Sequence, residues 1–175
     1  MEKPFLYEDH KREIQEMFVA DQQMRRRSIE KGGVIEIEED DTLDFRNTER
    51  MKQIIHDIGW PTISKVGAEI SNDAWLLVQH ADHDVTFQKK CLDLMKQQSE
   101  GEVSKRNIAY LEDRIRVNEG QPQLYGTQFR NEEGTPYGPC PIEDPEHVND
   151  RRKEMGMELL EEYTKIMLEK YKPAT

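Results

Sequence analysis

A histidine and two polar residues that can act with it lie at helical spacing in the middle of the chain. His80, Asp84 and Gln88 are each four residues apart, so on one continuous helix they form a single polar seam. In such a seam Asp84 orients the imidazole of His80 for general acid–base catalysis. The spacing therefore predicts His80 and Asp84 as catalytic residues and Gln88 as a substrate-binding residue.

Two charged residues continue the apolar face of the first helical segment. Ile14 and Phe18 mark this face, and Asp21 and Arg25 follow them at the same spacing. A buried carboxylate is costly unless it is paired, so Asp21 and Arg25 either satisfy each other structurally or join a site with His80. In the second case Asp21 is a third catalytic residue and Arg25 binds substrate.

Metal binding is an alternative use of the same groups. A histidine and a carboxylate one helical turn apart ligate divalent metals when a third ligand comes from elsewhere. If an ion is bound, the predicted ligands are His80, Asp84 and Asp21, although acid–base catalysis without a metal is the preferred hypothesis. The remaining alternative is a core histidine with a hydrogen-bonded partner and no chemical role.

A second polar seam borders the apolar stripe of a later helix. Asn107, Arg114 and Asn118 share this edge, and the planar guanidinium of Arg114 suits a carboxylate or phosphate. Its structural role would instead be an ion pair with Asp84 or Asp21. The functional alternative predicts all three residues of this seam as substrate-binding residues.

Three more residues complete the predicted substrate-binding set. Tyr125 and Gln128 lie in a loop rich in proline and glycine and can present hydrogen-bonding groups over a pocket. Arg152 falls on the inward face of the last helix, although helix-start electrostatics also explain an arginine there. The predicted pocket thus draws on residues from most of the chain.

These residues are compatible with three classes of function. The preferred hypothesis is a small enzyme that uses His/Asp acid–base chemistry for hydrolysis, elimination or isomerisation of an anionic small molecule, bound by Arg25 and Arg114. The second is a non-catalytic module that binds a small molecule or a protein through the same groups. The third is a buried ion-pair network with a purely structural role. The sequence identifies no cofactor, since it has no nucleotide-binding glycine loop, nucleophile elbow or HExxH pair.

Hydrophobic periodicity predicts a mostly α, single-domain bundle of about five helices. The expected helices cover about 8–31, 41–58, 71–100, 104–118 and 145–171. Residues 34–41 suggest a short edge strand or a charged loop, and Ser64 is expected to cap a short helix. Residues 121–142 predict a small β-hairpin or an ordered loop. The last helix is expected to turn four residues inward: Met155, Leu159, Tyr163 and Ile166.

Composition limits the partners and the compartment. The chain has 175 residues, typical of one domain over 1–175, and its 36 acidic and 25 basic residues give a formal net charge of -11. This charge repels nucleic acid and anionic lipid. Cys91 and Cys140 form no CxxC pair. Because no signal peptide or long apolar stretch is seen, we expect a cytoplasmic protein that binds neither nucleic acid nor membranes.

Several short motifs in a fixed order resemble an uncharacterised bacterial domain family. The motifs are Gly59-Trp60-Pro61, Val66-Gly67, Ala74-Trp75-Leu76-Leu77, Gln79-His80-Ala81-Asp82, Tyr110-Leu111-Glu112-Asp113-Arg114 and Gln123-Leu124-Tyr125-Gly126-Thr127-Gln128. Asp21, Arg25 and the run Asp150-Arg151-Arg152 also fit the family's pattern. The likeness covers most of the chain and implies a shared domain, but it implies no substrate or mechanism.

Overall fold

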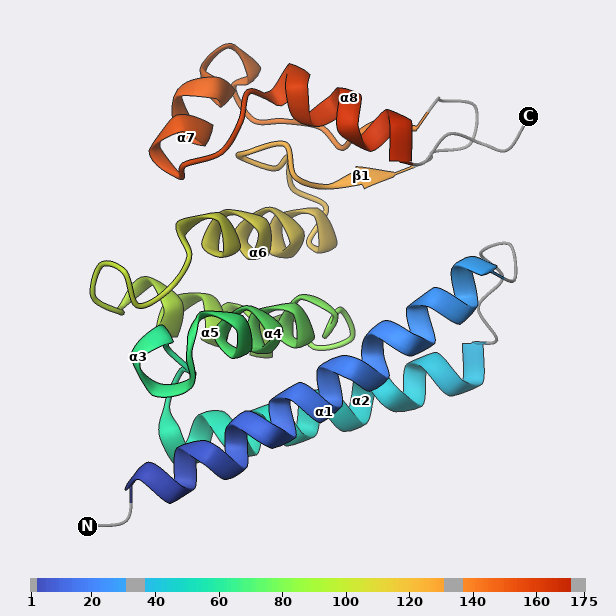
Figure 1. Cartoon of the computed structure of the whole chain (residues 1–175). Coiled ribbons are helices and arrows are strands. Elements are labelled where there is room, and N and C mark those ends of the chain that lie inside the picture. The colour runs from blue at the N-terminus through green and yellow to red at the C-terminus, as the bar shows by residue number, and fades with distance from the viewer. Residues whose placement is uncertain (1–2, 31–36, 131–136, 171–175) are drawn as a thin grey trace. The chain divides into compact units, whose positions relative to one another are not determined.

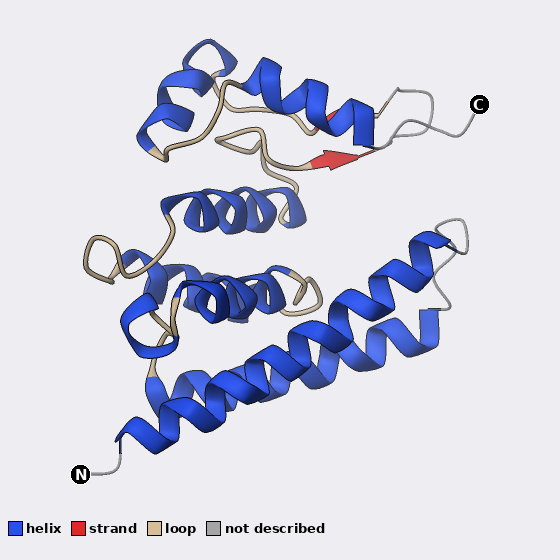
Figure 2. Cartoon of the chain, in the orientation of Figure 1, coloured by secondary structure: helices blue, strands red, loops and turns tan. Residues whose placement is uncertain are grey.

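The chain is mostly helical, as predicted. A computed structural model describes residues 3–30, 37–130 and 137–170. Within these ranges it forms eight α-helices, one 3-10 helix and a two-stranded antiparallel sheet (Figure 2). None of the described helices is both long enough and apolar enough to span a bilayer.

Contacts within the chain gather in two compact units, Met1–Ser104 and Lys105–Thr175. The prediction that 1–175 folds as one domain stays a prediction, because compactness alone does not tell whether either unit folds by itself.

The described residues of the first unit form five helices. Its core contains apolar side chains that are at most 1% exposed, among them Ile14, Met51, Ile54 and Trp60. The helix labelled α1 in Figure 1 packs against α2, α3 and α4. The bounds are α1 Lys3–Glu30, α2 Ile37–Ile58, α3 Ile63–Val66, α4 Ala68–Gln79 and α5 Val85–Lys96.

Two local predictions for this unit are wrong. The edge strand or charged loop expected over 34–41 is helix from Ile37 onward, and 34–36 lie outside the described residues. Acidic residues near a helix start complement its dipole, which makes the run after Ile37 compatible with helix. Ser64 does not cap α3, because the N-cap position is Thr62; instead Ser64 Oγ donates to Glu102 at 2.7 Å.

The single long helix predicted after residue 71 is in fact two helices. The α4 helix ends at Gln79, and α5 begins at Val85 after a tight turn. Asp84 is the N-cap of α5, and its Oδ1 accepts a hydrogen bond from the Phe87 amide at 2.9 Å. A capping aspartate of this kind stabilises a new helix start. The helical phase is therefore interrupted between His80 and Asp84.

The second unit holds the remaining elements. These are α6 Lys105–Asn118, β1 Phe129–Arg130, β2 Gly138–Pro139, the 3-10 helix η1 Pro145–His147, α7 Val148–Glu154 and α8 Leu160–Lys170. The two strands pair antiparallel, with Phe129 opposite Pro139 and Arg130 opposite Gly138. This pairing confirms the small hairpin predicted within 121–142.

The predicted last helix is also divided. The helix α7 ends at Glu154, and α8 begins only at Leu160. Between them Gly156 has a φ of +67°, a conformation that favours glycine. The inward face expected there is wrong for Leu159 and Ile166, which are 50% and 54% exposed. Met155 at the break is half-buried. Tyr163 is buried as predicted, at 8% exposure.

Candidate functional site

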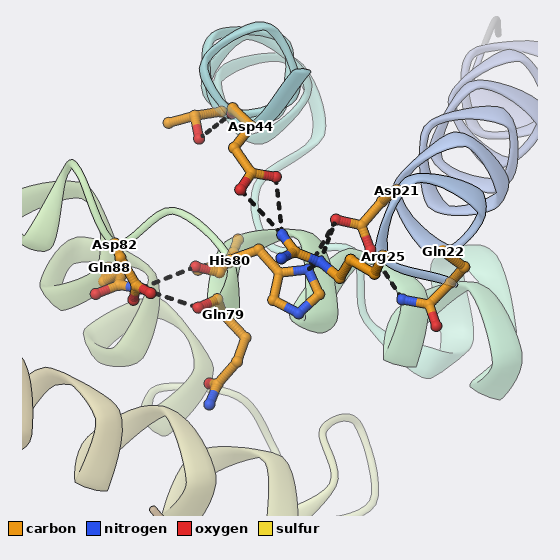
Figure 3. Close-up of polar contacts among 10 residues, drawn as sticks. Asp21, Gln22, Arg25, Asp44, Gln79, His80, Asp82 and Gln88 are labelled. Carbon is orange, nitrogen blue, oxygen red and sulfur yellow. Dashed lines mark hydrogen bonds and ion pairs between the residues drawn. The ribbon is translucent and has the colours of Figure 1, made fainter. Parts of the chain in front are cut away.

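Two residues far apart in the sequence meet at the end of α4. The Nδ1 atom of His80 lies 2.8 Å from Oδ1 of Asp21 on α1. Asp21 is fully buried, and the side chain of His80 is 15% exposed. Figure 3 shows the imidazole facing Asp21 and Arg25. The carboxylate is thus placed to orient the ring from one edge.

The Asp21 carboxylate favours a proton on Nδ1 of His80, although the Nε–H of Arg25 also points at Nδ1. Arg25 Nε lies 3.1 Å from Asp21 Oδ1 and 3.0 Å from His80 Nδ1. If Nδ1 were an acceptor, its lone pair would face the Asp21 carboxylate at 2.8 Å, which is repulsive. The favoured arrangement has both Nδ1–H of His80 and Nε–H of Arg25 donating to Asp21.

The other ring nitrogen of His80 is left available. Nε2 forms no hydrogen bond to any described residue. It is also not one of the fully buried side-chain atoms without a hydrogen-bond partner, so it keeps some exposed surface. When Nδ1 carries the proton, Nε2 of the neutral ring has a lone pair. This nitrogen can therefore accept a proton from a substrate or a water molecule.

Arg25 is held by a second carboxylate. Its Nη2 donates to both oxygens of Asp44 on α2, at 2.9 and 3.0 Å. Because one guanidinium lies between two carboxylates, these three side chains together carry a net charge of about -1 beside a neutral His80. The anionic substrate expected from Arg25 loses support here, because this arginine is already engaged by Asp21 and Asp44.

The pKa values of the two carboxylates shift in opposite directions. Burial alone would raise the pKa of Asp21, but its hydrogen bond to His80 and the charges of His80 and Arg25 lower it below the usual 3.8. For Asp44, burial is the larger effect and raises the pKa despite the Arg25 contacts. Asp21 is therefore the more firmly ionised partner of His80.

The seam predicted from His80, Asp84 and Gln88 is wrong, because the helix breaks between the first two. Asp84 caps α5 and its Oδ2 pairs with Lys52 at 2.9 Å. Gln88 is fully buried, and its Nε2 donates to the carbonyl of Val78 at 3.2 Å. In Figure 3 the dashed lines from Gln88 lead to backbone carbonyls and not to the imidazole. Asp21, and not Asp84, is therefore the residue that orients His80.

The structure does not assemble the alternative metal ligands. In the described ranges no group of three or more His, Cys, Asp or Glu side chains is arranged to hold an ion. Asp84 is engaged with Lys52, so it does not join His80 and Asp21 as a third ligand.

In the second unit, a buried aspartate organises the loop after α6. Asp113 is fully buried and accepts hydrogen bonds from the backbone amides of Leu124, Tyr125 and Thr127 at 2.7–3.2 Å. The Thr127 hydroxyl also donates to it at 2.9 Å. Burial raises the pKa of Asp113, although these hydrogen bonds act in the opposite direction. The carboxyl fixes the backbone of this loop.

The predicted binding residues of this unit lie on or beside the same loop. Tyr125 and Gln128 are half-buried, and Arg114 Nη1 donates to Gln128 Oε1 at 3.3 Å. Asn107 is half-buried on α6, whereas Asn118 at its end is exposed. The structure thus joins Arg114 to Gln128, and a binding role for these residues stays a prediction.

Arg152 lies inward as predicted, and two of its guanidinium nitrogens contact backbone carbonyls; a binding role for it stays a prediction. It is fully buried, and it donates to the carbonyls of Glu158 and Tyr125 at 2.6 Å each. Its guanidinium also lies 5.1 Å from the ring centre of Tyr163. Arg151 donates to the Leu124 carbonyl at 2.8 Å. Both arginines therefore fix the loop that Asp113 holds.

Sequence reasoning missed two of these carboxylates. Asp44 precedes Thr48 and Met51 at i+4 and i+7 on the buried stripe of α2, so an extended stripe would have found it. Asp113 was hidden because α6 buries residues on more than one side, including Ala109 and Leu111. A single apolar stripe does not describe such a helix.

A comparison with known families assigns the chain. The profile of a family described as "Family of unknown function (DUF6624)" matches residues 8–173. The chain belongs to this family. The match spans both units and includes Asp21, His80 and Asp113, but the description assigns the family no reaction. No curated protein and no solved structure matches the chain.

Proposed function

We propose that the first unit performs acid–base catalysis on a small molecule, with His80 as the catalytic residue. In this proposal Nε2 of His80 removes a proton from a substrate or water and later returns it. Asp21 is a positioning residue that holds the ring and stabilises the imidazolium formed during the reaction. Hydrolysis, elimination and isomerisation are the reaction classes that need this single proton shuttle.

The observation that carries the proposal is the pairing of a buried carboxylate with one edge of a partly exposed imidazole. Asp21 is fully buried and lies 2.8 Å from Nδ1, while Nε2 keeps access to solvent. A carboxylate at Nδ1 selects the tautomer whose Nε2 is a base, which is the arrangement that histidine bases use. Arg25 and Asp44 support it by fixing the Asp21 carboxylate on α1 against α2.

The test combines a chemical probe with a substrate screen. Diethyl pyrocarbonate acylates accessible imidazole nitrogens, so His80 should react in the folded protein, whereas His10, which is 5% exposed, should not. A library of small metabolites should then contain a compound that the wild type converts and His80→Gln does not. A loss of about a hundredfold or more is expected for removing a general base.

His83→Gln is the matched control. His83 is exposed three residues later, and its ring centre lies 3.9 Å from that of Phe45, so conversion should persist in this variant. An unreactive His80, or conversion that survives in His80→Gln, would contradict the proposal.

A structural role is the second candidate, and one observation favours it. The bonds from Arg25 to Asp21 and Asp44 connect α1 with α2, and the bond from Asp21 to His80 connects α1 with the end of α4. Such a network could have no role other than to hold these helices together. In that case His80→Gln destabilises the fold, and no compound in the screen distinguishes it from the wild type at equal folded concentration.

A further inference from the structure

Asp73 on α4 is a nearly buried carboxyl group that the described residues leave without a partner. It is 5% exposed, and it forms no hydrogen bond or ion pair with any described residue. Asp21 and Asp113, the other buried acids of the described ranges, each accept several hydrogen bonds. Buried polar groups nearly always have partners, so Asp73 requires an explanation.

The described residues around Asp73 supply no positive charge. Burial raises its pKa to about 6, and the charge of Glu69 one turn earlier acts in the same direction. Among the described residues, no arginine or lysine contributes to the shift of its pKa. Neither carboxyl oxygen is among the fully buried atoms that lack a hydrogen-bond partner, so the carboxyl group keeps some exposed surface. A cation is the ligand that such a group attracts.

Asp73 and His80 share one face of α4. The two residues are seven positions apart, which on an α-helix is two turns, an axial rise of about 10 Å and an angular offset of about 20°. The backbone of His80 continues the helical conformation, with φ of -87° and ψ of 0°. Leu76, which is half-buried, lies on the same face between them. The order along this face is carboxyl, apolar side chain, imidazole.

The His80 end also favours positive charge. Arg25 is shared by Asp21 and Asp44, and the C-terminal end of α4, where His80 lies, carries the negative end of the helix dipole. Both ends of the Asp73–His80 face therefore disfavour an anion and favour a cation.

We infer that Asp73 binds the ammonium group of an elongated amine whose other end reaches His80, so that the substrates of this site are alkylammonium compounds. The apolar chain of the amine lies along Leu76. The inference rests on the proposed function for its catalytic consequence, but the binding itself is independent of turnover.

The experiment uses the full chain with hexylammonium chloride as the probe. Hexanoate and hexanol have the same chain with negative and zero charge. Hexylammonium should shift the NMR signals of His80 Cε1–H and of the Leu76 amide in a saturable way. Hexanol and hexanoate should not. Equal or tighter binding of hexanoate, or no saturable shift with hexylammonium, overturns the inference.

Asp73→Asn tests the role of the carboxyl directly. It should weaken hexylammonium binding by at least about tenfold, which corresponds to about 1.4 kcal/mol. Asp93→Asn is the control, because it removes the same charge from an exposed position on α5 and should leave the affinity unchanged. If Asp73→Asn binds as the wild type does, or Asp93→Asn is weakened equally, the inference is wrong.

The failure of the inference is distinguishable from that of the proposed function. His80→Gln should still bind hexylammonium, as reported by the Leu76 amide, if Asp73 holds the ammonium group. Binding in this variant without any His80-dependent conversion would contradict the proposed function alone. Conversion that depends on His80 but extends to no amine, together with absent hexylammonium binding, would contradict the inference alone.

Discussion

Asp21 and His80 lie 59 residues apart in sequence, and their side chains meet at 2.8 Å. The contact joins the long first helix to the residue that ends α4. It favours the tautomer with the proton on Nδ1 and gives the histidine a buried counter-charge. Asp21, and not a residue near His80 in the sequence, is therefore the carboxylate in contact with the imidazole.

Asp21→Asn should destabilise the protein and reverse the tautomer of His80. The amide removes a buried negative charge that Arg25 and His80 share, which costs about 3 kcal/mol at neutral pH. Because the pKa of Asp21 is lowered in the folded state, this contribution is present above pH 3.8 and is lost as pH falls through the lower folded pKa. Urea unfolding across this range measures the difference.

The tautomer gives a second readout for the same variant. The side-chain amide that replaces the carboxylate can donate to Nδ1, so ¹⁵N spectra of the histidine ring should show the proton moving to Nε2. An unchanged tautomer together with unchanged stability would show that Asp21 does not position His80.

Asp84→Ala should cost stability without affecting His80. It removes the cap on the Phe87 amide, worth about 1 kcal/mol, and an ion pair with Lys52 that is too exposed to add much. The ring nitrogen spectra of His80 should stay as in the wild type. A change in the His80 tautomer in this variant, larger than that in Asp21→Asn, would restore Asp84 as the orienting residue.

Local spacing is sufficient to predict one part of the site and misleading for another. Asp21 and Arg25 are one turn apart on one unbroken helix, so their pairing follows from the sequence alone. His80, Asp84 and Gln88 have the same spacing, but no glycine or proline marks the break between α4 and α5. The only local signal is Asp84 itself, a residue type favoured at N-caps.

Other parts of the site depend on tertiary contacts that spacing does not encode. The hairpin within 121–142 follows from its proline and glycine content, yet its anchoring by Asp113 depends on where α6 lies. The helix predicted over about 71–100 has Asp73 in its first turn, whereas α4 begins at Ala68. A residue near a predicted boundary is easily assigned to a cap, and its burial is then overlooked.

Asp113→Ala should release the loop that contains Tyr125. The change leaves three backbone amides without their acceptor and creates a small cavity, so a loss of about 3 kcal/mol is expected. Hydrogen exchange of the Leu124, Tyr125 and Thr127 amides should accelerate more than that of the amides in α6. Equal acceleration throughout the unit, or protected loop amides, would show that Asp113 does not hold this loop.

Asp73→Asn should stabilise the protein at neutral pH. The folded-state pKa of Asp73 is raised from 3.8 to about 6, so the folded state binds more protons than the unfolded chain between these values. Stability from this group is therefore complete below pH 3.8 and declines as pH rises through about 6. Removing the charge should therefore raise the free energy of unfolding at neutral pH.

The pH dependence distinguishes this gain from better packing. The advantage of Asp73→Asn over the wild type should disappear below pH 3.8, where the wild-type carboxyl is protonated in both states. Asp93→Asn, at an exposed position, should change stability little at either pH. A stabilisation by Asp73→Asn that is independent of pH would mean that the charge of the carboxyl group is not what lowers the stability of the wild type. A loss of stability at neutral pH would mean that Asp73 has a protein partner, and the ammonium site proposed for it would then be occupied by the chain itself.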